Sequence, residues 1–262
     1  WDDVQVAGLS RLVEFCRAQG SAVGIQIAHG GRKSWGDDLV APSALAFPGY
    51  PVPHALGTSE IRDVVESWRQ AARRARLAGF DLLEIHSAHG YLIHEFLSPL
   101  SNQRTDEYGG SLENRMRFLL EVVEAVQSEW PGDRPLCVRL SAVDYLEGGL
   151  TITDTVEIAK ALKAKGVDLL DISSGGILSA RIETGPGYQV PFAEAVKKGA
   201  GIPTIAVGLI TSPELVQEIL ANGRADFVAL GRELLRNPYW VLEAKKEQEL
   251  WPEQYHRALP TD

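Results

Sequence analysis

The chain alternates between short apolar runs and amphipathic helical patterns, and this alternation repeats six times. The strand-like runs are Ala22 to Ala28, Phe80 to Ile85, Leu136 to Leu140, Val167 to Ile172, Thr204 to Val207 and Asp226 to Leu230. The helical patterns are Val4 to Gln19, Thr58 to Ala78, Ser111 to Trp130, Thr151 to Gly166, Pro191 to Gly199, Pro213 to Asn222 and Pro238 to Glu249. Strands and helices in strict alternation build parallel βαβ units, so we predict a single α/β domain over residues 1–262.

Two parallel architectures fit this order of elements, a (β/α)8 TIM barrel and a doubly wound open sheet. A Gly-x-Gly-x-x-Gly turn, typical of dinucleotide-binding open sheets, follows none of the strands. The last two strands each end in a glycine, Gly208 and Gly231, and Arg232 follows the second. Loops in these positions of a barrel commonly bind phosphate. The alternative is that each glycine is only a turn residue. We therefore predict a TIM barrel with six βα units visible in this chain.

Six units do not close a barrel of eight, so we expect the first two units to be absent here. The chain begins at Trp1 without an initiator methionine, and its first pattern is already a helix. A partly given chain is the simpler expectation, because a true fragment would expose two unpaired strand edges.

The charge and composition exclude several classes of partner. A net charge of -9 and a pI near 5.2 argue against nucleic acid and against an anionic membrane surface. The sequence contains no apolar run long enough to cross a bilayer and no signal peptide. Its two cysteines, Cys16 and Cys137, predict neither a disulfide framework nor a metal or iron–sulfur cluster. We expect a cytoplasmic protein.

The stretch from Phe80 to Arg117 carries the densest set of titratable groups. Two histidines, His86 and His89, and Tyr91 follow directly after a strand-like run. The carboxyl ends of parallel strands are where ligands bind in such folds, so this cluster is a candidate site by its position. The long irregular segment from His29 to Gly57 is predicted to form a lid or excursion near it.

Four motifs in this chain resemble the old yellow enzyme family. They are IQIAHGGRK at Ile25 to Lys33, HSAHGYLIHEFLSPLSNQRTDEYGGSLENR at His86 to Arg115, VRLSA at Val138 to Ala142 and VALGRELLRNPYW at Val228 to Trp240. The second motif is long and specific, and the resemblance is nearest to the thermophilic-like subgroup. The resemblance implies a (β/α)8 barrel that binds FMN, takes hydride from NADPH or NADH, and reduces activated carbon–carbon double bonds.

The resemblance also implies roles for the histidine cluster. His86 and His89 match the pair that donates hydrogen bonds to the carbonyl oxygen of an α,β-unsaturated carbonyl substrate, where negative charge develops. Tyr91 matches the proton donor to the α-carbon, its alternative being a packing role. A zinc site is the rival for the histidines, because neutral imidazoles are good ligands. The third ligand would come from His29, Glu84 or His94, none of which has convincing spacing.

Two polar residues within apolar strands match flavin-contacting residues of the family. Gln26 is expected to be a buried amide that pairs with the flavin pyrimidine edge, or otherwise with neighbouring backbone. Arg139 is costly to bury unless it meets negative charge. The resemblance places it beside the flavin ring, and an ion pair with Glu84 or Asp171 is the plain alternative.

Gly208, Gly231 and Arg232 form the predicted phosphate set, because glycines allow backbone N–H groups to approach and arginine binds phosphate bidentately. Arg236 is a candidate second cation, or a surface charge. Near the end of the chain, Arg257 matches the arginine that thermophilic-like members send into a neighbouring subunit's site, which implies a homo-oligomer. An exposed terminal arginine is the alternative.

Three functions remain in view at this point. The first is an FMN-dependent ene-reductase. The second is a relative of dienoyl-CoA reductases, which carry an iron–sulfur cluster that two cysteines cannot hold. The third is a catalytically silent barrel fragment or assembly subunit. Flavin absorbance of the purified protein would favour the first, and failure to take up added FMN would favour the third.

Overall fold

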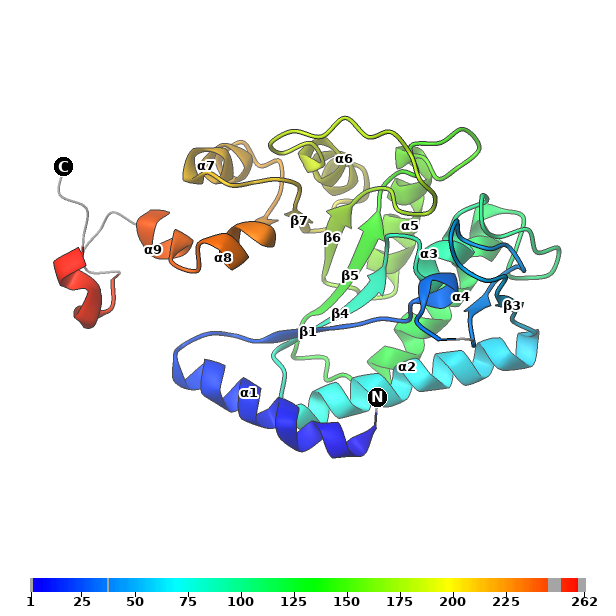
Figure 1. Ribbon diagram of the computed structural model, residues 1–262, viewed down its shortest axis with the longest axis horizontal. Coiled ribbons are helices and arrows are strands. Elements are labelled where there is room, and N and C mark those ends of the chain that lie inside the picture. Colours follow the sequence, from blue (N-terminus) through cyan, green and yellow to red (C-terminus); the bar gives the residue numbers. More distant parts are fainter. Residues whose placement is uncertain (1, 37, 245–250, 259–262) are drawn as a thin grey trace.

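A computed structural model describes residues 2–36, 38–244 and 251–258 of the chain. Six parallel strands form one sheet in the order β1-β4-β5-β6-β7-β8, which is also their order along the chain (Figure 1). Their bounds are Gly24–Ile27 (β1), Leu82–Ser87 (β4), Leu136–Ser141 (β5), Leu169–Ser173 (β6), Thr204–Ala206 (β7) and Phe227–Val228 (β8). A doubly wound sheet reverses its strand order at a switch point, and this sheet does not. The sequential order is that of a barrel wall.

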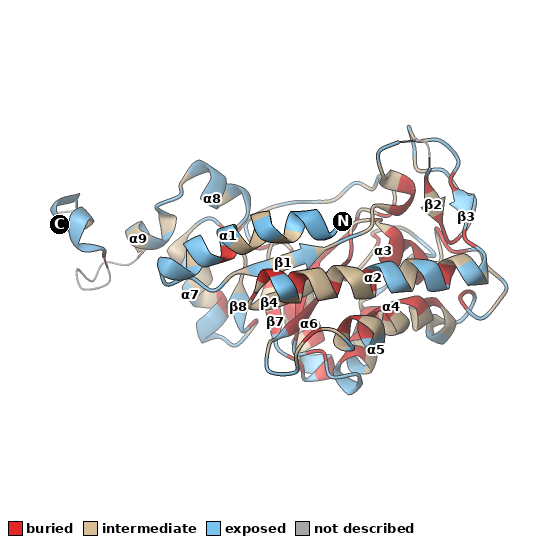
Figure 2. Ribbon diagram, turned by 90° about the horizontal axis from the view of Figure 1, so that it is seen from below, coloured by how far each residue is buried: buried red, intermediate tan, exposed pale blue. Residues whose placement is uncertain are grey.

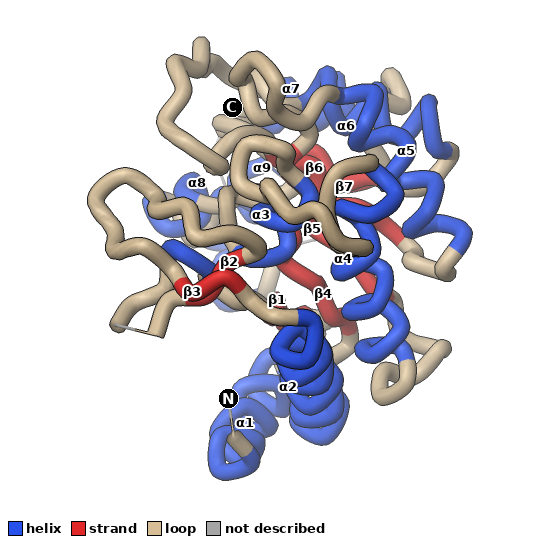
Figure 3. Tube along the Cα trace, turned by 90° about the vertical axis from the view of Figure 1, so that its right-hand side faces the viewer, coloured by secondary structure: helices blue, strands red, loops and turns tan. Residues whose placement is uncertain are grey.

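Helices line one face of the sheet and leave the other to the site. The bounds are Val6–Ala18 (α1), Thr58–Ala78 (α2), Leu92–Leu97 (α3), Leu112–Gln127 (α4), Ile152–Ala164 (α5), Val190–Ala200 (α6), Pro213–Ala221 (α7), Arg232–Arg236 (α8) and Trp240–Ala244 (α9). Helices α2, α4, α5 and α6 pack side by side in chain order, with α1 outside α2 (Figure 3). This single outer layer is the second mark of a barrel.

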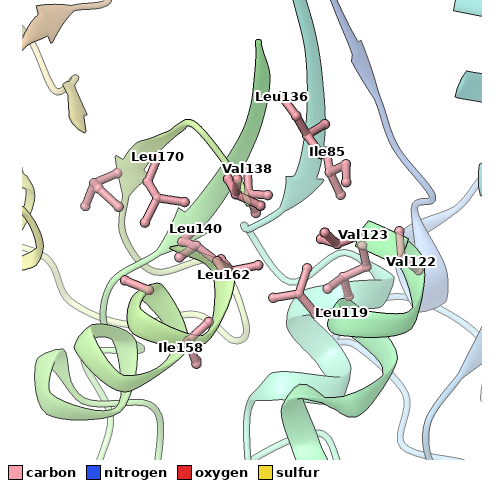
Figure 4. Packing of buried hydrophobic residues seen from close by; sticks show 14 of the residues in the cluster. Ile85, Leu119, Val122, Val123, Leu136, Val138, Leu140, Ile158, Leu162 and Leu170 are labelled. Carbon is pink, nitrogen blue, oxygen red and sulfur yellow. The ribbon is translucent and has the colours of Figure 1, made fainter. Parts of the chain in front are cut away.

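The hydrophobic core lies between this layer and the middle of the sheet. Strands β4, β5 and β6 place Ile85, Val138 and Leu170 in register on one face. Leu119 of α4 and Leu162 of α5 pack toward that face, and both are fully buried (Figure 4). Each such side chain contributes about 1.5–3 kcal/mol by leaving water. Figure 2 shows the same concentration of buried residues around β4, with exposed residues on α1.

Side chains on the opposite face of these strands are polar. Because neighbouring residues in register share a face, His86, Arg139 and Asp171 lie side by side across β4, β5 and β6. Glu84 and Cys137 form the row below them. In a closed barrel this face is the lumen. The sheet therefore gathers its titratable groups where the helices cannot cover them.

Helix ends agree closely with the sequence signals. The Ser111 side chain accepts a hydrogen bond from the backbone N–H of Asn114 and begins α4. Thr151 and Asp154 form a reciprocal capping box at α5. Helix α2 ends at Gly79, whose φ of 89° is left-handed and suits glycine. These caps set where each helix returns the chain to the sheet.

Three segments differ from the sequence predictions. The excursion at residues 29–57 contains a 3-10 turn, η2 (Gly31–Lys33), and a two-stranded parallel pair, β2 (Val40–Ala41) and β3 (His54–Ala55). The buried helix α3 follows Tyr91, where no helix was predicted. Helix α9 lies within the last predicted helix, Pro238 to Glu249, of which residues 245–249 lie outside the described part of the chain, and α8 precedes it as a helix that was not predicted. Among the described residues, no helix has the length and apolarity needed to cross a membrane.

Candidate active site

The candidate site begins at the carboxyl end of β4, where the chain turns sharply. His89 has a φ of 59° and Gly90 a φ of 71°, so two successive residues adopt left-handed backbone. Such a conformation costs a non-glycine residue free energy and is held only by its surroundings. The backbone N–H of His89 donates to Ser141 Oγ at 2.9 Å, and Ser141 Oγ donates to the Gly175 carbonyl at 2.8 Å. The turn is therefore fastened to the loop after β6.

The two predicted histidines contact each other. His86 Nε2 lies 3.2 Å from His89 Nδ1. The remaining nitrogens have other partners: the Ala88 backbone N–H donates to His86 Nδ1 at 3.1 Å, and His89 Nε2 lies 2.7 Å from Ser173 Oγ. The structure thus brings together two residues that the sequence predicted and adds Ser173, which it did not.

Both imidazoles are neutral near pH 7. Burial, together with the nearby Arg139 guanidinium, lowers the pKa of His86 to about 4 and that of His89 to about 3. A neutral imidazole has one donor and one acceptor nitrogen. This state suits hydrogen bonding to a developing oxyanion.

Among the described residues, no group of three or more His, Cys, Asp or Glu side chains is placed to hold a metal ion.

Tyr91 stands beside the histidines as predicted. Its ring centroid is 5.0 Å from that of His86, with the planes inclined at 46°. The residue precedes α3 in extended conformation and is half-buried. Its hydroxyl makes no hydrogen bond within the described part of the chain, so it is available to a ligand.

Arg139 makes the ion pair proposed as its plain alternative and also faces a cavity. Its Nε lies 3.2 Å from Asp171 Oδ2. Burial nonetheless raises the pKa of Asp171 to about 7, although Arg139 opposes this rise. Arg139 Nε and Asp171 Oδ1 are buried without a hydrogen-bond partner among the described residues. Buried polar atoms in this condition indicate that a ligand completes the site.

A cavity of about 340 Å³ opens beside Arg139 and holds the whole predicted phosphate set. Its wall includes Arg139, Ser173, Gly208, Gly231, Arg232 and Arg236. At Gly208 the φ is 120°, and an added Cβ would lie 3.0 Å from Gln189 Oε1. At Gly231 the same Cβ would meet no atom within 4 Å, so that space faces the cavity rather than protein.

The residues of this cavity fit FMN, the cofactor implied by the family resemblance. One end offers arginines and glycine backbone to a phosphate, and the other offers a flavin ring the guanidinium of Arg139, whose buried Nε makes no hydrogen bond among the described residues. Arg232 makes no ion pair within the described residues, whereas Arg236 donates to Glu233 at 2.6 Å. Of the two cations, Arg232 is the one that is free for an anion.

Gln26 does not join this cavity, and the expectation that it is buried is wrong. It lies on the edge strand β1, is exposed, and donates from Nε2 to Glu84 Oε1 at 2.6 Å. It lines a separate groove between β1 and α2. Because β1 has no neighbour on its outer side in this structure, an apolar strand does not imply a buried amide.

Arg257 also lies apart from the histidines within this chain. It is exposed in the 3-10 turn η4 (Glu253–Ala258), which lies beyond α9 and away from the sheet (Figure 1). The η4 residue Tyr255 packs near Tyr239, with ring centroids 5.8 Å apart. A contribution to a site in another subunit stays a prediction.

The excursion contributes Lys33 rather than Trp35 to the site. Lys33 Nζ donates to the carbonyls of His89 at 2.7 Å and Gly176 at 2.5 Å, and burial lowers its pKa to about 8. Trp35 is 97% exposed and covers nothing. Sequence reasoning missed Ser173 and gave no role to Gln189, because a serine at a strand end and a glutamine in a loop carry no local signal.

Comparisons with known proteins identify relatives of this chain. Residues 1–250 match the family described as NADH:flavin oxidoreductase / NADH oxidase. The chain is 55% identical to the NADPH dehydrogenase of Geobacillus thermodenitrificans (strain NG80-2), over 98% of the chain and 77% of that protein. It is 50% identical to the NADPH dehydrogenase of Bacillus subtilis (strain 168), again over 98% and 77%.

Solved structures confirm the predicted barrel class. Morphinone reductase superposes with a TM-score of 0.81 at 31% identity, over 99% of this chain and 77% of that protein. A 2-naphthoyl-CoA reductase gives a TM-score of 0.86 at 30% identity, over 91% of this chain and 40% of that longer protein. With the family match and the relatives at half identity or more, the resemblance to old yellow enzymes is confirmed. The chain belongs to the NADH:flavin oxidoreductase / NADH oxidase family of FMN-dependent NAD(P)H oxidoreductases.

Proposed function

We propose that this protein is an ene-reductase, which uses NADPH or NADH to reduce the carbon–carbon double bond of an α,β-unsaturated carbonyl compound. One observation carries the proposal. Two neutral histidines, with a tyrosine beside them, lie next to Ser173 and Arg139. Ser173 and Arg139 also line the cavity that is suited to FMN. Substrate donors and cofactor groups therefore lie next to each other at one mouth of the sheet.

Bound FMN would supply the hydride transfer from the reduced nicotinamide to the β-carbon of the acceptor. For this chain's residues, we assign the phosphate to Arg232 and to the backbone at Gly208 and Gly231, with Arg236 as a second cation. Arg139 is assigned to the flavin ring, and its place on the cavity wall, with a buried Nε that makes no hydrogen bond among the described residues, supports the assignment. Gln26 remains the proposed partner of the pyrimidine edge, because its bond to Glu84 engages one of the two Nε2 hydrogens and its Oε1 accepts no hydrogen bond among the described residues.

His86 and His89 bind the carbonyl oxygen of the substrate. Negative charge develops on that oxygen as the β-carbon is reduced, and fixed N–H donors stabilise it. In other enzymes, loss of one such donor costs about 2.7–4 kcal/mol of transition-state stabilisation. Tyr91 then donates its phenolic proton to the α-carbon, a step for which general acid help contributes about 10²–10⁴-fold.

A homo-oligomer is part of the proposal. Arg257 lies on η4 and is exposed, which supports its placement in the substrate site of a neighbouring subunit. The two free cysteines, Cys16 and Cys137, suit a reducing compartment such as the cytoplasm. Sedimentation velocity of wild type and of Arg257→Ala, combined with enone turnover, tests the shared site.

The proposal is tested by replacing the two histidines together. We expect His86→Ala/His89→Ala protein to keep its bound FMN, measured by flavin absorbance, and its reduction by NADPH. Reoxidation of the reduced flavin by cyclohex-2-enone should slow by at least about 100-fold. The matched control is His54→Ala, because His54 is exposed and pairs only with Glu60. Undiminished enone reduction in the double variant would contradict the proposal.

A further inference from the structure

The hydrogen bonds around the two histidines determine which ring nitrogen carries each hydrogen. A backbone N–H can only donate, so the bond from Ala88 makes His86 Nδ1 an acceptor. The single hydrogen of neutral His86 is then on Nε2, and it donates to His89 Nδ1 at 3.2 Å. His89 Nδ1 is thereby an acceptor as well, so the hydrogen of His89 is on Nε2 and donates to Ser173 Oγ at 2.7 Å.

Ser173 has an unused hydrogen in this arrangement. Gln189 is buried and donates from Nε2 to Ser173 Oγ at 2.8 Å. With His89, this fills both acceptor positions of the hydroxyl. Among the described residues, Ser173 Oγ has no hydrogen-bond partners other than His89 and Gln189, so its own hydrogen has no separate acceptor. The serine is nevertheless buried.

The hydrogen-bond partners of the four ring nitrogens also indicate where the carbonyl oxygen of a ligand would bind. His86 Nδ1 and His89 Nε2 are occupied by Ala88 and Ser173. The other two nitrogens, His86 Nε2 and His89 Nδ1, have only each other. A carbonyl oxygen inserted between them accepts the hydrogen of His86, but it meets a lone pair on His89 Nδ1. Two donors therefore require His89 to carry its hydrogen on Nδ1.

We propose that substrate binding switches the tautomer of His89 from Nε2–H to Nδ1–H, and that Ser173, held by Gln189, permits the switch by changing from acceptor to donor. This inference rests on the proposed function of the two histidines. His89 loses the hydrogen on Nε2 and gains one on Nδ1 through exchange with water, so the ring stays neutral and no net proton is taken up. Ser173 keeps its hydrogen and only rotates it toward His89 Nε2.

The switched arrangement satisfies every group that the ligand-free one leaves incomplete. The Ser173 hydrogen gains an acceptor, and the oxygen gains two donors. The Gln189 amide keeps its bond to Ser173 in both states, which makes it the fixed point of the relay. Ser173 and Gln189 are thus positioning residues that act through His89, and both lie on the wall of the cofactor cavity.

The test is ¹⁵N-histidine NMR of the FMN-loaded, oxidised protein, in which multiple-bond ¹⁵N–¹H correlations show which ring nitrogen carries hydrogen. Without ligand, we expect Nε2–H on both His86 and His89. With saturating cyclohex-2-enone and no reduced nicotinamide, His89 should change to Nδ1–H while His86 stays as Nε2–H. Persistence of Nε2–H on His89 in the enone complex would overturn the inference.

Variants separate the relay from mere folding. Ser173→Ala should abolish the tautomer change and weaken enone binding about tenfold, whereas Ser173→Thr, which keeps the hydroxyl, should restore both. Ser174→Ala is the matched control, because the neighbouring buried hydroxyl accepts a hydrogen bond from Tyr145 and, among the described residues, makes none to either histidine. A full tautomer change in Ser173→Ala would also overturn the inference.

The outcomes distinguish this inference from the function on which it rests. If bound enone alters the signals of neither histidine while the enzyme still reduces it, the histidines do not hold the oxygen and both fail. If His86 responds and His89 keeps its tautomer, the substrate site stands and the Ser173 switch alone fails.

Discussion

The middle and the edge of the sheet support the two halves of the site very differently. Every residue of β6 is buried, and the histidine cluster lies at the carboxyl end of β4, which β5 separates from β6, with the helix layer behind the sheet. The phosphate end of the cofactor cavity is formed instead by the loops that follow β7 and the edge strand β8 and by helix α8, and α8 has no buried residue. The groups that need exact orientation thus rest on the rigid core, whereas the phosphate loops lie where ligand contacts must supply their order.

Core burial predicts the largest contrast between these regions. Phe118 is fully buried, and its ring centroid lies 4.4 Å from that of Phe96, whereas Phe227 on β8 is 54% exposed. We expect Phe118→Ala to lower the free energy of unfolding by about 3–5 kcal/mol and Phe227→Ala by less than about 1 kcal/mol. Urea denaturation measures both, and equal losses would show that the edge is packed as tightly as the middle.

The buried histidines predict a loss of stability in acid. Their pKa values of about 4 and about 3 in the folded protein lie below the ordinary 6.5. As the pH falls below 6.5, both histidines therefore become protonated in the unfolded chain while they stay neutral in the folded chain. The free energy of unfolding should therefore fall by about 2 kcal/mol for each histidine between pH 7 and pH 5. Below their folded pKa values the loss stops growing.

A double variant isolates this effect from that of other groups. Glu95 acts in the opposite direction, since burial raises its pKa to about 8 and stability falls as the pH rises from 4.5 toward that value. The difference between wild type and His86→Gln/His89→Gln removes this common contribution. We expect the variant's stability to depend less steeply on pH, with His54→Gln behaving as wild type. Parallel pH curves would contradict neutral burial of the pair.

Two nearby arginines test the cavity at the edge. Arg232→Ala should raise the Kd for FMN about 10–100-fold, because it removes a charge-assisted contact to phosphate. Arg236→Ala should change the Kd less, since Arg236 already pairs with Glu233. Fluorescence quenching of FMN on titration measures both, and reversed effects would exchange their roles.

The smallest expected effect concerns the excursion at residues 29–57, which contacts the histidine turn through Lys33. Lys33→Met keeps the aliphatic stem but loses the bonds to the carbonyls of His89 and Gly176, so we expect a loss of about 1 kcal/mol and altered His89 NMR signals. Trp35→Ala should change the free energy of unfolding by no more than about 0.5 kcal/mol. A large effect of Trp35→Ala on the KM for enone would show that this part of the predicted lid does cover the site.

Local pattern sufficed for much of the fold and for the positions of the main candidate residues. Apolar runs and helix caps such as Ser111 and Thr151 are decided by neighbours in the chain, so the order of the βα units was predictable. Positions at strand ends follow from that order, and this placed His86 and the glycines Gly208 and Gly231 at one mouth. The family motifs then supplied roles that spacing alone left open.

Long-range packing decided what local pattern could not. The exposure of Gln26 depends on whether another strand pairs with the outer side of β1. The residues next to Gln26 in the sequence do not indicate whether such a strand is present. His89 and Ser173 lie 84 positions apart in the sequence and meet only because β4, β5 and β6 pair in a particular register. The sequence alone determined the fold class and the residue types available to the site. The tertiary structure decided which of them touch, because contacts between strands depend on register and burial across the whole sheet.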